Sequence, residues 1–108
     1  MNAGDIVLIP FPYAELTQVK VRPAVVISQT EDIHKDLIVS AISSVVPAKL
    51  GKREFVLIPN ATNKLRVKSV VKTDRIVTLK SEDKIANLGK LSSKELQLFK
   101  KLLHEMIG

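Results

Sequence analysis

Cysteine is absent from this chain of 108 residues, and aromatic residues and histidines are scarce. Without cysteine there is neither a disulfide framework nor a thiolate metal site, a composition that fits a reducing cytoplasm. Four aromatic residues are too few for the stacking platform that RNA-binding sheets use, although one of them, Tyr13, stands in a polar stretch where it could stack on a base. These absences therefore exclude a disulfide-stabilised domain, a thiolate metal site and an RNA-binding sheet that stacks bases on several aromatic side chains.

Long apolar stretches are also missing. The longest apolar run, residues 6–14, contains two prolines and falls well short of the ~20 residues that a membrane helix needs. The first residues show neither the basic region nor the apolar segment of a signal peptide. We therefore expect a cytoplasmic protein with no membrane contact.

Several catalytic signatures are lacking as well. The chain has no Gly-rich phosphate loop, no Gly-x-Ser-x-Gly elbow and no cluster of His, Asp and Glu at metal-ligand spacing, so we expect no metal site and no cofactor. His34 stands in an acidic turn and His104 on the polar side of a helix, positions typical of surface residues. If the protein cleaves RNA, we expect it to do so without a histidine pair.

Positive charge is what the chain has in excess. The net charge is +6, and residues 49–75 hold eight Lys or Arg side chains against Glu54 and Asp74. Such a segment suits a polyanion like RNA, whose phosphates are bound mainly through charge. A lysine-rich solvated surface explains the same composition equally well. Charge alone supports nucleic acid without establishing it.

The apolar patterning predicts a single domain, residues 1–108, that is mainly β with a C-terminal helix. Short runs rich in β-branched residues, separated by turn residues, predict a small and strongly bent sheet or barrel. The expected strands are residues 5–11, 21–28, 36–44, 53–59, 69–73, 75–80 and 85–88. Gly89, between Leu88 and Lys90, directly follows the last of these segments and predicts a bulge or a close backbone approach.

The end of the chain predicts the helix. Ser92 is a good N-cap, and Glu95 three residues later completes a capping box. A wide apolar stripe follows, which we expect to pack in the core or in a dimer contact. Its members are Leu96, Phe99, Leu102, Leu103, Met106 and Ile107.

Arg22 is the best candidate for chemistry. Pro23 cannot donate to a sheet and therefore belongs at the start of a strand, and its ring favours an extended conformation of Arg22. The guanidinium is then held on rigid scaffold beside the polar loop 12–20, and its planar fork of donors suits a phosphate. A surface salt bridge to Asp5 or Glu15 is the structural alternative.

Five segments in order resemble the MazF/PemK family of toxin endoribonucleases, and together they extend over nearly the whole chain. The segments are residues 4–12, residues 21–28, Ala41-Ile42-Ser43-Ser44, residues 69–74 and residues 88–92. The resemblance implies an SH3-like barrel of the MazF/PemK/CcdB-like kind, a homodimer, and metal-independent, sequence-specific cleavage of single-stranded RNA. It also implies a partner antitoxin whose disordered acidic segment covers the RNA groove and mimics the charge of RNA.

The resemblance assigns roles to residues. It implies that Arg22 is catalytic, that Ser43 supplies a hydroxyl and that Asp74, with Lys72 two positions before it, takes part in proton transfer. Certain relatives carry a histidine in the first loop, where this chain has none, which shifts the expected base to Asp74. From the residues alone, Ser43 is only a strand-end hydrogen bonder, and Asp74 is equally the cap of a turn between two strands. The expected RNA contacts are Tyr13, Gln18, Lys20, Lys72 and Arg75.

Two other functions remain open at this stage. Toxins of the same fold bind DNA gyrase without catalysis, and a barrel of this kind also suits an RNA or protein adaptor. The combination of Arg22, Ser43 and Asp74 favours the nuclease, because a pure binder has no need of all three.

Overall fold

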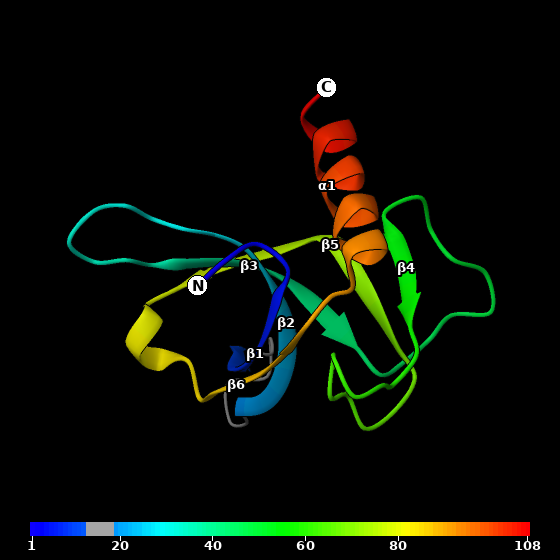
Figure 1. The fold of residues 1–108 in the computed structure, drawn as a ribbon, viewed down its shortest axis with the longest axis horizontal. Helices are drawn as coiled ribbons and strands as arrows, with labels where there is room; N and C mark the ends of the chain where they lie inside the picture. Colours follow the sequence, from blue (N-terminus) through cyan, green and yellow to red (C-terminus); the bar gives the residue numbers. More distant parts are fainter. Residues whose placement is uncertain (13–18) are drawn as a thin grey trace.

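The computed structural model describes residues 1–12 and 19–108. In this part of the chain six antiparallel strands form one curled sheet in the order β4-β5-β3-β2-β1-β6, and a helix follows the last strand (Figure 1). The predicted class, mainly β with a C-terminal helix on a strongly bent small barrel, is confirmed. The elements are β1 (Asp5–Pro12), β2 (Val19–Gln29), β3 (Leu37–Ser43), β4 (Glu54–Leu57), β5 (Ser69–Leu79), the 3-10 turn η1 (Ser81–Asp83), β6 (Ala86–Lys90) and α1 (Ser93–Ile107).

The strand β5 corrects one prediction. The sequence predicted two strands with Asp74 capping a turn between them, but β5 runs unbroken through Asp74. The signal that looked like a turn is a bulge, because Ala41 of β3 pairs with Lys72 while Ser40 pairs with Ile76. Residues 73–75 stand between these paired positions, and such an insertion bends a strand without ending it.

The curled sheet has a hydrophobic cluster on each face, as the alternation of a strand dictates. Neighbouring residues of β1 go to opposite clusters: Ile6 packs with the helix side, and Val7 packs with Val26 and Val39. On the helix side, the rings of Phe55 and Phe99 lie 6.4 Å apart. The sheet is thus held on both faces, which fixes the strand ends that carry the site.

The helix begins as predicted. The Ser92 side chain accepts a hydrogen bond from the Glu95 backbone N–H at 3.2 Å, and Glu95 Oε1 accepts one from the Ser92 N–H at 2.8 Å. Phe99 and Leu102 are buried. Ile107 is 84% exposed, so the apolar stripe extends beyond the core of this chain.

The prediction for Gly89 is confirmed in both respects. The pairing of β1 with β6 shifts register between Ile6, opposite Gly89, and Val7, opposite Asn87. A Cβ atom at Gly89 would lie 2.7 Å from the Asn63 carbonyl oxygen and closer still to that of Thr62. The absence of a side chain lets the connection between β4 and β5 rest directly on β6.

Candidate active site

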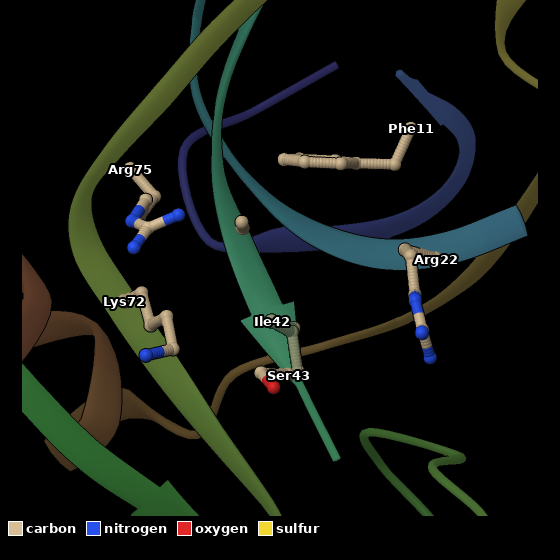
Figure 2. A pocket seen from close by; sticks show the side chains of 7 residues that line it. Phe11, Arg22, Ile42, Ser43, Lys72 and Arg75 are labelled. Carbon is tan, nitrogen blue, oxygen red and sulfur yellow. The ribbon is translucent and has the colours of Figure 1, made fainter. Parts of the chain in front are cut away.

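A cavity of about 160 Å³ opens where β2 and β3 separate. β2 pairs with β3 from Ala24, opposite Ala41, toward Gln29, so Ile42 and Ser43 extend beyond this pairing. The cavity collects side chains from four strands, as Figure 2 shows. Its lining residues are Phe11, Arg22, Ala41, Ile42, Ser43, Lys72 and Arg75.

Arg22 lies inside β2 rather than at its start, because the strand already begins at Val19. It is half-buried and paired with Ile9 of β1. The following Pro23 pairs with Leu8 on the β1 side, one residue before the pairing with β3 begins at Ala24. A proline without an N–H is tolerated where one side of its strand has no partner strand. The Arg-Pro pair therefore marks the place where the sheet divides.

Ser43 is the last residue of β3 and is half-buried. Its Oγ accepts a hydrogen bond from the Val45 backbone N–H at 3.1 Å, so the expected strand-end hydrogen bond is present. A hydroxyl that accepts one bond still has a hydrogen to donate. The strand-end role and a role in the cavity are compatible.

Lys72 enters the cavity from β5 in an ion pair with the opposite residue of β4, Glu54. Lys72 Nζ lies 3.1 Å from Glu54 Oε2, and Gly51 donates its backbone N–H to Glu54 Oε1 at 2.7 Å. The Gly51 bond, and after it the Lys72 ammonium, hold the pKa of Glu54 below its ordinary value. An ionised Glu54 fixes the lysine at the cavity wall, while the ammonium retains donors for a ligand.

Asp74 is not among the residues that line this cavity. It is exposed at the bulge of β5 and lines a neighbouring hollow together with Lys72, Arg75, Glu54 of β4 and Arg53, which precedes β4. Of the three predicted catalytic residues, Arg22 and Ser43 thus share one cavity and Asp74 lies beside it. Lys72 and Arg75 line both spaces.

The remaining predicted contacts are divided. Lys20 is exposed on β2, whereas Tyr13 and Gln18 lie outside the described residues. The apolar cavity residues Phe11, Ala41 and Ile42 were not predicted as site residues, and neither was Glu54, the partner of Lys72. Opposite charges facing each other on adjacent strands could have revealed Glu54, but only once the register of β4 and β5 was known.

Within residues 1–12 and 19–108, no group of three or more His, Cys, Asp or Glu side chains is placed to hold a metal ion. In the same part of the chain, no helix is both long and apolar enough to cross a membrane.

Comparison with known proteins comes from one family model, described as PemK-like, MazF-like toxin of type II toxin-antitoxin system, which matches residues 2–107. The match includes every strand of the sheet and all of α1. No curated protein matches the chain.

Proposed function

Because the chain belongs to the family of PemK-like, MazF-like toxins of type II toxin–antitoxin systems, we propose that it is a sequence-specific, metal-independent endoribonuclease that cleaves single-stranded RNA. The observation that carries this proposal is the cavity at the division of the sheet, where Arg22, Ser43, Lys72 and Arg75 come together from three strands. Three cations and a hydroxyl around one small cavity suit a phosphate group in transfer.

The reaction we propose is internal attack by the ribose. The 2′-hydroxyl oxygen bonds to the adjacent phosphorus, the bond from phosphorus to the 5′-oxygen breaks, and the products are a 2′,3′-cyclic phosphate and a 5′-hydroxyl. One proton leaves the 2′-hydroxyl and one reaches the 5′-oxygen. Arg22 is the group we assign to the charge on the phosphorane, since its fork can donate to two oxygens at once.

Ser43 and Asp74 take the supporting roles. The Ser43 hydroxyl, which accepts from Val45, donates its hydrogen to a phosphate oxygen. Asp74, beside the cavity and next in sequence to Arg75, receives the proton of the 2′-hydroxyl. Lys72 and Arg75, which line both spaces, hold the RNA backbone between them, and Lys20, Tyr13 and Gln18 extend the contact.

The antitoxin partner that the family implies fits the same surface. We propose that its acidic, largely disordered segment folds over the basic residues of positions 49–75 and blocks RNA, that the toxin works in the cytoplasm, and that it is a homodimer. The apolar stripe of α1, with Ile107 left exposed by this chain, supports a dimer contact.

The test is incubation of purified protein with a mixed-sequence RNA in the presence of a chelator, followed by analysis of the new ends. We expect cleavage with cyclic phosphate and 5′-hydroxyl ends. Loss of cleavage on chelation, or a 5′-phosphate product, would contradict the mechanism. A parallel incubation with DNA gyrase and plasmid separates the rival function, since a gyrase poison would trap cleaved plasmid and leave the RNA intact.

A further inference from the structure

A second cavity lies beside the candidate active site and shares Arg22 with it. It holds about 530 Å³, within the roughly 300–1,000 Å³ of typical ligand sites. It lies between Arg22 and Pro23 of β2, the end of β3 and the connection from β4 to β5. In Figure 2 Arg22 lies on the other side of β3 from Lys72 and Arg75 of β5, consistent with a residue that lines two spaces.

The wall opposite the strands is a connection without regular secondary structure, residues 60–68, that is nevertheless tightly organised. Asn63 is 1% exposed, and its Oδ1 accepts backbone N–H groups from Asn60 and Leu65, both at 3.0 Å. Its Nδ2 donates to the Ile58 carbonyl oxygen at 2.9 Å. One buried amide thus replaces the hydrogen bonds that a helix or strand would otherwise supply.

The same connection is anchored to β6. The Lys90 backbone N–H donates to the Thr62 carbonyl oxygen at 3.1 Å, and Gly89 leaves no room for a side chain between the two segments. Lys64 follows in the left-handed region with φ 55°, a conformation that turns the chain back toward the cavity. The connection therefore presents Lys64, Leu65, Arg66 and Val67 to the cavity from a fixed frame.

The chemistry of the lining is that of a nucleotide site. Arg22, Lys64 and Arg66 are cationic, and among the described residues that line the cavity none is acidic. Apolar side chains, including those of Leu65, Val67 and Leu88, make up most of the remaining wall. A flat base with an attached phosphate needs an apolar slot next to positive charge.

We propose that this second cavity holds the nucleotide next to the scissile phosphate and sets the base preference of cleavage. The proposal rests on the proposed function, because it uses Arg22 as the link between the reacting phosphate and the neighbouring nucleotide. The base of this nucleotide lies against Leu65, Val67 and Leu88. Lys64 and Arg66 hold the phosphate that follows it on the side away from the scissile phosphate.

A matched pair of variants tests the preference. Val67→Ala and Ile58→Ala each shorten one exposed apolar side chain between β4 and β5, but only Val67 lines the cavity. Sequencing of the 5′-hydroxyl ends from a random RNA pool measures the preference of each protein. We expect Val67→Ala to reduce cleavage at the preferred sites on the order of tenfold and to relax the base preference, because this side chain contacts the base, and Ile58→Ala to leave the preference unchanged. Equal preferences in both variants and the parent would overturn the proposal.

A binding measurement keeps this proposal separate from the catalytic one. The methyl signals of Leu65, Val67 and Leu88 in the full chain are followed by NMR during titration with each of the four nucleoside 5′-monophosphates, with ribose 5-phosphate and inorganic phosphate as controls. We expect one nucleotide to shift these signals at concentrations where the controls do not. Shifts of equal size with every probe, or with none, would contradict a base site, whether or not the protein cleaves RNA. Selective shifts from a protein that fails to cleave would instead contradict the proposed function alone.

Discussion

Two connections in this fold are organised by the same kind of hydrogen bond, from backbone N–H groups to one side-chain oxygen, but they carry net charges of opposite sign. The connection 30–36, between β2 and β3, is acidic, and the connection 60–68, between β4 and β5, is basic. In the first, Asp32 Oδ1 accepts the backbone N–H groups of His34 and Lys35; in the second, Asn63 Oδ1 accepts those of Asn60 and Leu65. Each contains a lysine at positive φ, Lys35 at 47° and Lys64 at 55°.

The difference between them lies in what surrounds the side chain that organises each turn. Asp32 is exposed, so water can replace its hydrogen bonds when the turn opens. Asn63 is buried beneath β6, where an unpaired N–H or carbonyl has no water to replace the lost partner. Similar hydrogen bonds therefore hold only the local turn in the connection between β2 and β3, whereas in the connection between β4 and β5 they build a rigid wall of the second cavity.

The largest expected effect is that of Asn63→Ala. The change leaves the buried Leu65 N–H and the Ile58 carbonyl without their partner, which should lower the free energy of unfolding by about 2–4 kcal/mol. Urea denaturation measures the loss. Asn63→Asp keeps the acceptor for both N–H groups and removes only the donor, so it should lose less. If Asn63→Ala lowered the free energy of unfolding no more than the substitution of an exposed residue does, the connection 60–68 would not be the rigid wall described above.

Gly89→Ala should follow. A Cβ at this position meets backbone atoms of Thr62 and Asn63, which cannot rotate away, so we expect a loss of about 1–3 kcal/mol. The same measurement on Gly51→Ala provides the control, because there the nearest atom is Glu54 Oε1 at 3.1 Å, the end of a side chain. Equal stability of the two variants would show that the connection yields to β6 and is not fixed by it.

Asp32→Asn should have the smallest effect, and the effect should depend on pH. A hydrogen bond from the Thr30 hydroxyl, and then those from the His34 and Lys35 backbone, hold the pKa of Asp32 below its ordinary value. A carboxylate whose pKa is lowered by folding stabilises the fold above its unfolded pKa, and that contribution is lost as pH falls through the folded pKa. The parent should therefore exceed the variant in stability near neutral pH and approach it as the pH falls below the ordinary aspartate pKa of about 4. A difference between the two that does not change with pH would show that the charge of Asp32 plays no part.

Much of the fold could be predicted from the sequence because its signals are local. The capping box at Ser92 and Glu95 and the β-branched runs each act within a few residues of themselves. The unbroken course of β5 could not be predicted, because a three-residue bulge opposite Ser40 and Ala41 leaves the same polar interruption as a turn. Register across strands decides between the two, and register is not a local property.

The candidate site also has features that could be predicted from local sequence and features that depend on strand register. Arg22, placed by the proline after it, and Ser43, which ends β3, were both predicted site residues, and both line the cavity. The ion pair of Lys72 with Glu54 and the separation of Asp74 from the cavity depend on how β4, β5 and β3 align. Neither could be read from spacing along the chain.

The most direct test of the central claim, that the cavity at the division of β2 and β3 cleaves RNA, is the single-turnover cleavage rate of Arg22→Ala. A charged donor aimed at a developing anion is worth about 10²–10³ in rate, and we expect a loss of that size. Arg22→Lys should recover only part of it, since an ammonium lacks the bidentate fork, and Ser43→Ala and Asp74→Asn should lose less than Arg22→Ala. Lys80→Ala, which removes an exposed charge just beyond the end of β5, should cleave like the parent. A folded Arg22→Ala protein that cleaves as fast as the parent would contradict the account.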